Sequence, residues 1–285
     1  MVPVAFGTQT GGSIIRPASY CGVVGYKPSF DTINPTGVKP LATSFDTVGV
    51  MARSVADCAM VVGVLSGAAW RREGVRAVNR RALTTSNIKS ARFGLCRTHA
   101  WPDAEPATVR AVESCADALL RAGAVVVDVA LPDDFAGFLD AQADVLRFDG
   151  ARVFAFERTN HWELLSTTAR KEFEYGASLS RDRYVEAQAL IAHCRMLFAE
   201  AVAAYDCFLS ASAAGEAPLG LHDTGEAMFN RLTSGLHVPC ITLPGYKGPG
   251  GLPVGVQLIG AMGNDEVLLA IAARVESVLG SEGPD

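Results

Sequence analysis

A serine follows two adjacent glycines near the start of the chain, in the run Thr10-Gly-Gly-Ser13. Glycine has no Cβ, so the backbone at Gly11 and Gly12 can turn sharply and a ligand can approach it closely. A serine directly after such a turn lies beside backbone N–H groups. Acyl transfer needs this combination, a nucleophile next to donors that stabilise a developing oxyanion. The same residues are also typical of a tight turn whose serine hydrogen-bonds its own backbone, so the local pattern leaves both interpretations open.

Several other kinds of site are excluded by spacing. Ile15 stands where a G-x-S-x-G nucleophile elbow needs its second glycine. Neither a GxxxxGK[ST] phosphate loop nor an HExxH motif occurs, and the five histidines have no ligand-type spacing. We therefore expect no cofactor and no metal site.

Composition describes a soluble globular protein. Hydrophobic residues make up 49% and charged residues 19% of the 285 positions, and the net charge of -5 gives no electrostatic case for nucleic acid or an anionic membrane. The seven cysteines are an odd number without a C-x-x-C pair, which favours buried free thiols and a cytoplasmic location. The arginine cluster between positions 71 and 81 is interpreted as part of a solvated connector over 68–90.

The elements that would position the serine indicate an α/β fold with a mixed central sheet flanked by helices. Phe93–Cys96, a helix from Pro106 and the β-branched run Ala124–Val129 form a strand–helix–strand unit, whose second strand we expect to be buried. Two apolar runs, Pro239–Leu243 and Leu252–Ile259, predict a hairpin.

Further elements follow from capping and periodicity. Ser54 and Asp57 form a capping box for a helix ending at Leu65, and the span 184–205 predicts one long helix. Asp265 and Glu266 lie in the first turn of a C-terminal helix, where the macrodipole favours acids. The short apolar runs at 21–26 and 48–51 are expected to be strands or buried loops, and 207–209 a short strand.

The stretch Gly7–Tyr26 as a whole resembles the core of the amidase signature family, serine hydrolases that cleave carbon–nitrogen amide bonds. The resemblance continues, in the family's order, through blocks at both ends of the chain, with a less specific helical middle. These blocks are Gly25-Tyr-Lys-Pro-Ser29, Ser44-Phe-Asp-Thr-Val-Gly49, Ala52-Arg-Ser-Val-Ala-Asp57, Gly215-Glu-Ala-Pro218, Phe229-Asn-Arg-Leu232 and Gly251-Leu-Pro-Val-Gly-Val-Gln-Leu-Ile-Gly260.

The resemblance implies an amidohydrolase that works through an acyl-serine intermediate. It assigns the nucleophile to Ser13 and the oxyanion-hole amides to Thr10, Gly11, Gly12 and Ser13 itself. It also implies that 1–285 is a single amidase-like domain in which 135–235 is a mostly helical, substrate-side region. The expected partner is a small amide of open identity, with a homodimer possible because exposed sheet edges invite association.

One departure from the family pattern affects the catalytic base. In the family, a neutral lysine acts through a bridging serine with a cis peptide bond, and both lie upstream of the nucleophile. Met1 to Gly12 contains neither a lysine nor a serine. Lys27 belongs to a block that is structural in the family. We therefore expect an N-terminally truncated, inactive amidase, and the alternative is a non-catalytic amidase-like binding or interaction protein or a gene remnant.

Smaller departures concern the scaffold. Asp31 replaces a usual glycine, Val50 a usual proline, and Ser210-Ala-Ser212 a usual Thr-Pro-Thr. Asp46 and Arg53 are interpreted as scaffold residues satisfied by an ion pair or by backbone hydrogen bonds.

Overall fold

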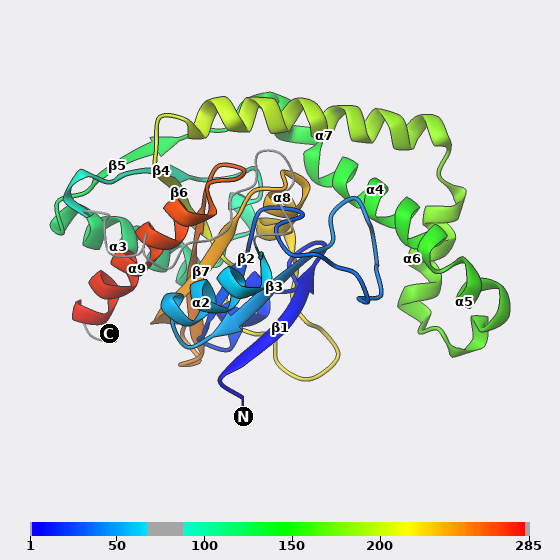
Figure 1. Ribbon diagram of the computed structural model, residues 1–285, viewed down its shortest axis with the longest axis horizontal. Helices are drawn as coiled ribbons and strands as arrows, with labels where there is room; N and C mark the ends of the chain where they lie inside the picture. Colours follow the sequence, from blue (N-terminus) through cyan, green and yellow to red (C-terminus); the bar gives the residue numbers. More distant parts are fainter. Residues whose placement is uncertain (1, 68–87, 283–285) are drawn as a thin grey trace.

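A mixed eight-stranded sheet forms the centre of the computed structural model, which describes residues 2–67 and 88–282 (Figure 1). The strand order is β1-β3-β2-β7-β8-β6-β4-β5. Pairing is antiparallel from β1 to β6 and parallel among β6, β4 and β5. The predicted mixed α/β fold is confirmed. The strands are β1 (Val4–Gln9), β2 (Val24–Lys27), β3 (Thr47–Ala52), β4 (Arg92–Cys96), β5 (Val125–Val129), β6 (Cys207–Ala211), β7 (Cys240–Lys247) and β8 (Pro253–Ile259).

Helices cover both faces of this sheet and build two separate hydrophobic clusters. One cluster packs α2, α3 and α9 on the sheet, and the other packs α1, α4, α7 and α8. Helices α4, α5 and α6 gather beyond one end of the sheet, and α7 runs along the molecule above it (Figure 1). The helices are α1 (Ile15–Tyr20), α2 (Val55–Leu65), α3 (Pro106–Arg121), α4 (Phe138–Val153), α5 (Ala155–Asn160), α6 (Thr167–Ser178), α7 (Arg181–Val202), α8 (Met228–Gly235) and α9 (Asp265–Glu282).

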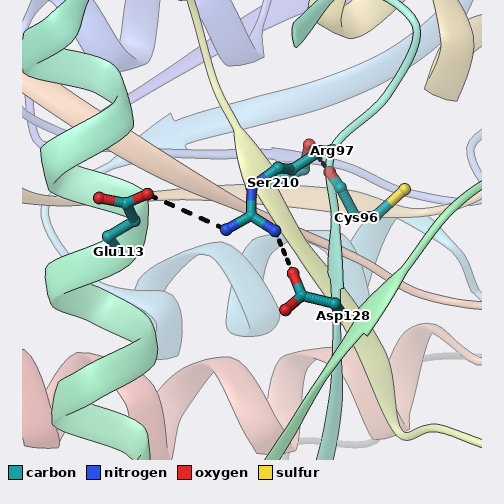
Figure 2. Close-up of polar contacts among 5 residues, drawn as sticks. All are labelled: Cys96, Arg97, Glu113, Asp128 and Ser210. Carbon is teal, nitrogen blue, oxygen red and sulfur yellow. Dashed lines mark hydrogen bonds and ion pairs between the residues drawn. The ribbon is translucent and has the colours of Figure 1, made fainter.

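The strand–helix–strand unit β4-α3-β5 is present, but its second strand is not buried. β5 lies at the edge of the sheet, with Val125 and Val127 41% and 38% exposed. A β-branched run therefore indicated a strand correctly and its burial wrongly, because burial depends on a neighbour that local sequence does not reveal. Figure 2 shows how this edge is held: the Arg97 guanidinium lies between Glu113 of α3 and Asp128 of β5.

Ser210 also takes a structural part in this region. Its hydroxyl donates to the carbonyl oxygen of Cys96 at 2.9 Å and so links β6 to β4 (Figure 2). The Ser212 hydroxyl, directly after β6, lies 2.7 Å from that of Thr242 of β7. Both serines are buried. Threonine carries the same hydroxyl, so the serines at these two positions keep the hydrogen-bonding group of the usual Thr-Pro-Thr.

Most predicted elements are present with shifted ends. The hairpin of β7 and β8, the helix α2 and the long helix α7 all form. Ser54 accepts from the backbone N–H of Asp57 at 3.1 Å, as a helix N-cap does. The Asp57 carboxylate, however, accepts from the Ser54 hydroxyl and not from its backbone N–H. Strand β1 had no counterpart among the predicted elements. The arginine cluster at 71–81 lies outside the described residues, and Ile88–Ser90, at the end of the predicted connector, form a 3-10 helix.

The sequence predicts only a helix-terminus role for Asp265, but its carboxylate also accepts hydrogen bonds from another element. It is 1% exposed, and its carboxylate accepts from the Tyr26 hydroxyl at 2.5 Å, from the Ser29 backbone N–H at 2.8 Å and from the Ser29 hydroxyl at 2.5 Å. Burial and this carboxylate raise the pKa of Tyr26 well above its ordinary value. Asp265 therefore joins α9 to the end of β2, beside the loops described next.

Candidate functional site

Ser13 lies at the end of the sheet where several loops meet. It follows β1 and precedes α1, and its side chain is exposed. In the pairing of β1 with β3, Gln9 lies opposite Thr47, and in the pairing of β2 with β7, Lys27 lies opposite Cys240. The segments before β3 and β7 therefore reach the same end of the sheet as the segment after β1. The sheet thus brings together the Thr10–Ser13 loop, the loop before β3 and the end of α8.

Gln9 holds the chain on both sides of the serine. This buried side chain accepts, through Oε1, from the backbone N–H groups of Ile14 and Ile15, each at 3.0 Å. Its amide nitrogen donates to the hydroxyl of Ser234 at 3.1 Å. Since Ile14 and Ile15 are already bonded, they are not available to hold an oxyanion. The amides ahead of them in the loop are the remaining candidates.

Three other side chains fix the glycine turn from neighbouring elements. The Ser234 hydroxyl of α8 donates to the Gly11 carbonyl oxygen at 2.7 Å, and the Gln142 amide of α4 donates to the Thr10 carbonyl oxygen at 3.2 Å. The Thr10 hydroxyl donates to Asp46, whose other carboxylate oxygen accepts from the backbone N–H of Leu41 at 2.7 Å and of Ala42 at 3.0 Å.

Asp46 is therefore a scaffold residue, as its block predicted, satisfied by backbone N–H groups and one hydroxyl. Gln9, Gln142 and Ser234 were not singled out from the sequence. Gln9 adjoins the Gly-Gly-Ser run, but Gln142 and Ser234 are brought to it only by folding. These residues leave the loop little freedom, which is what a preorganised oxyanion site requires.

The two glycines of the turn differ in the space around them. A Cβ on Gly12 would lie 2.7 Å from Asn230 Oδ1 and 3.0 Å from the Ala227 Cβ, whereas one on Gly11 would meet nothing nearer than 3.8 Å. Across the described residues, the backbone N–H groups of Gly11, Gly12 and Ser13 donate no hydrogen bond. The same residues offer no partner to the Ser13 hydroxyl.

Lys27 serves the scaffold, as predicted. It is fully buried at the end of β2, and its ammonium donates to the carbonyl oxygens of Pro28 at 2.9 Å and Val238 at 2.7 Å. Burial lowers its pKa. Its contacts tie β2 to the segment before β7 and not to Ser13.

The long loop before α8 is fastened to the helix that follows Ser13. The Arg16 guanidinium donates to the carbonyl oxygen of Gly225 and, at 3.3 Å, to the Thr224 hydroxyl. Burial is the largest influence on Arg16 and lowers its pKa. At the loop's other end, the Glu216 carboxylate accepts from the backbone N–H groups of Gly250 and Leu252 at 3.0 and 2.7 Å. This loop therefore lies beside the candidate site in a fixed position.

Comparison with known proteins gives a consistent result. The family model described as Amidase matches residues 1–269. The A subunit of glutamyl-tRNA(Gln) amidotransferase from Fusobacterium nucleatum subsp. nucleatum is 28% identical over 98% of this chain and 64% of its own length. The same subunit from Granulibacter bethesdensis is 30% identical over 95% of this chain and 61% of its own. The chain thus spans less than two thirds of these relatives.

Solved structures agree in fold. A crystal structure of an amidase superposes with a TM-score of 0.85 at 27% identity, over 96% of this chain and 62% of that one. The native peptide amidase from Stenotrophomonas maltophilia gives 0.80 at 27% identity, over 100% of this chain and 63% of that one. Of the helices described here, none has the length and apolar character to cross a membrane.

Proposed function

Because this chain belongs to the amidase family, we propose that it hydrolyses amide carbon–nitrogen bonds through an acyl intermediate on Ser13. The observation that carries this proposal is the Thr10–Ser13 loop. It presents an exposed serine directly after two glycines and holds them by side chains from β1, α4 and α8.

The proposed reaction has two steps. Ser13 Oγ attacks the amide carbonyl carbon and loses its proton to a base, and the backbone N–H groups of Gly11, Gly12 and Ser13 stabilise the oxyanion that forms. The amine leaves with a proton, and water then cleaves the acyl–serine ester. Donors of this kind typically contribute about 3 kcal/mol each to the transition state. The family resemblance assigns the backbone N–H of Thr10 to the same oxyanion hole. The carbonyl oxygen of Thr10 accepts a hydrogen bond from the Gln142 amide.

The described residues supply candidates for the nucleophile and the oxyanion donors but no clear candidate for the base. A serine hydroxyl is a weak nucleophile at neutral pH until a base takes its proton. Within the described residues, no titratable group contacts the Ser13 hydroxyl, and the Lys27 ammonium is held by two carbonyl oxygens. We therefore expect residues 1–285 alone to turn over amides about 10⁴–10⁶-fold more slowly than a chain with a complete base system.

The substrate class is proposed from the relatives. They include an amidotransferase subunit and a peptide amidase, so we propose that the leaving group is an amine or ammonia from a small amide. The amidotransferase relative is one subunit of an assembly, which supports a protein partner as a second proposal for this chain. From the surface of this chain itself, the protein partner that we propose is a second copy, which gives a homodimer.

The test is an assay of three proteins on a panel of aliphatic, aryl and peptide amides. They are the 285-residue chain, a version extended by any in-frame codons upstream, and the Ser13→Ala variant of that extended version. We expect Ser13-dependent amine release from the extended version and little from the other two. Equal release with and without the Ser13 hydroxyl would contradict the proposal and favour a non-catalytic amidase-like binding protein.

A further inference from the structure

A cavity with a polar and an apolar wall lies between α4, α7 and the loops at the Ser13 end of the sheet. Its volume is ≈ 230 Å³. Phe45, Val145 and Ile191 supply apolar surface, and Arg195 and His237 supply polar groups. The mechanism proposed for Ser13 uses none of these five residues.

Arg195 is a cation without a carboxylate partner in the described part of the chain. Its guanidinium is half-buried, donates through Nε to the Gly235 carbonyl oxygen at 2.9 Å, and contacts His237. The arginines Arg147 and Arg183, on neighbouring helices or the same one, pair with Glu172 and Asp144. Burial lowers the pKa of Arg195 to about 10, so the group still carries its charge at neutral pH.

The Asp149 carboxylate of α4, which contacts the same loop as His237, has other partners. Asp149 accepts from the backbone N–H of Ser44 at 3.1 Å and from the Tyr184 hydroxyl at 3.1 Å. A guanidinium that lacks an acidic partner and lines a cavity can pair with a carboxylate from outside the chain. The cavity in front of Arg195 has room for one.

His237 contributes its Nε2 atom to the polar wall. Its Nε2 lies 2.8 Å from Arg195 Nη2 and 2.7 Å from the Ser44 carbonyl oxygen. The guanidinium can only donate and the carbonyl can only accept, so Nε2 cannot serve both contacts in one protonation state. An anion that accepts from Arg195 would leave Nε2–H to donate to Ser44. The His237 ring stacks on the Phe30 ring, with 4.0 Å between the ring centroids, and this contact fixes its orientation.

We propose that this cavity binds a small carboxylate, with the carboxylate on Arg195 and a short apolar body against Phe45, Val145 and Ile191. Arginine matches a carboxylate through two parallel hydrogen bonds. The cavity volume of ≈ 230 Å³ is several times the roughly 30 Å³ that one water takes in the liquid, so an acid of four to six carbons fits. The chain's net charge of -5 gives no general attraction for anions, so binding depends on this local cation.

The cavity and the Ser13 loop are connected through α8. Gly235, which accepts from Arg195, directly follows Ser234, whose hydroxyl holds the Gly11 carbonyl oxygen. The carboxylate could therefore belong to a free acid or to the acyl part of an amide substrate. Binding itself requires neither Ser13 nor a base, so the proposal stands independently of the catalytic one.

The test is isothermal titration of the full 285-residue chain with butyrate at constant ionic strength and pH 7. We expect Arg195→Gln to weaken binding at least tenfold and Arg195→Lys to weaken it less. Arg181→Gln is the matched control, because Arg181 is exposed on the same helix, and it should bind as the wild type does. Butyramide, the neutral isostere, should bind at least tenfold more weakly. Val145→Phe, which fills the cavity without changing charge, should abolish binding.

Folding of each variant is checked by its melting temperature. If folded Arg195→Gln binds butyrate as tightly as the wild type, or the folded wild type does not bind millimolar butyrate, the proposal is overturned. A further arm identifies the source of the carboxylate. Protection of Ser13 by butyrate against an acylating ester supports the substrate's acyl part, and butyrate binding without protection supports a free acid.

Discussion

At the scale of single residues, the candidate site depends on one glycine that cannot be replaced and one that can. Gly12 packs against Asn230 and Ala227, whereas Gly11 has ordinary space around its Cα. The sequence presents the two as equivalent neighbours. The structure distinguishes them, because α8 approaches the loop on one side only.

Gly12→Ala should therefore impair the site more than Gly11→Ala. The added methyl would lie 2.7 Å from Asn230 Oδ1, so α8 or the loop must shift, at a cost of about 1–3 kcal/mol in the free energy of unfolding. The same shift would displace the Ser13 amide and lower the rate of Ser13 acylation at least tenfold. Urea denaturation and acylation rates check this. Equal losses in the two alanine variants would contradict it.

Asp265 gives a second residue-scale prediction. Asp265→Ala would leave the Tyr26 hydroxyl and two donors of Ser29 buried without their acceptor, which should lower the free energy of unfolding by about 2–4 kcal/mol. Glu266→Ala is the matched control, since Glu266 is the next acid of the same helix turn and is less buried. It should change stability by about 0.5 kcal/mol or less. Denaturant titration of both variants decides whether the hydrogen bonds or the helix terminus matter more.

At the scale of elements, the contact between α9 and α2 is sensitive to pH. The half-buried Glu276 carboxylate accepts from the Val55 backbone N–H at 3.0 Å, but burial, with a smaller contribution from Asp57, raises its pKa above the ordinary value of 4.5. As the pH rises, the unfolded chain ionises Glu276 first. The free energy of unfolding therefore falls between the unfolded-state pKa and the folded-state pKa.

Glu276→Gln should remove this fall, because glutamine keeps an acceptor for Val55 and carries no charge. The stability of the variant relative to the wild type should rise from pH 4 upward and become constant once the folded-state pKa is passed. Urea denaturation at several pH values measures it. A stability difference that is the same at every pH would show that ionisation of Glu276 has no part in the contact.

The elements also show what the sequence could and could not predict. Periodicity and capping predicted α2, α3, α7, α9 and the hairpin, because these signals are local. β1 was missed and β5 was expected to be buried, because the position of a strand in a sheet depends on distant partners. At the candidate site, Ser13, Gly11 and Gly12 could be proposed from adjacent residues. Gln142, Ser234 and Arg195 could not, since their roles arise only from contacts across the fold.

At the scale of the whole molecule, the described sheet ends in an edge that carries apolar side chains. β1 lies at one end of the strand order, and its Phe6 is 61% exposed. An uncovered edge strand with an aromatic side chain is a surface on which a second chain can pair. A homodimer through β1 is therefore the assembly that we propose for this chain.

Phe6→Lys should weaken that association at least tenfold, because a lysine on an edge strand opposes pairing with another strand. Val64→Lys is the matched control, since Val64 is 76% exposed on α2. It should leave association unchanged. Sedimentation velocity over a range of concentrations gives the result, and a wild-type chain that stays monomeric throughout would contradict the dimer.

The central claim is that Ser13 is the nucleophile, and acylation by an activated ester tests it most directly. A p-nitrophenyl ester has a good leaving group, so its reaction depends less on the base than amide hydrolysis does. Peptide mass spectrometry of the treated 285-residue chain should find the acyl group on Ser13, with no adduct there in Ser13→Ala and at least tenfold less in Gly12→Ala. An adduct spread over other serines, or none on Ser13 in the folded protein, would contradict the account.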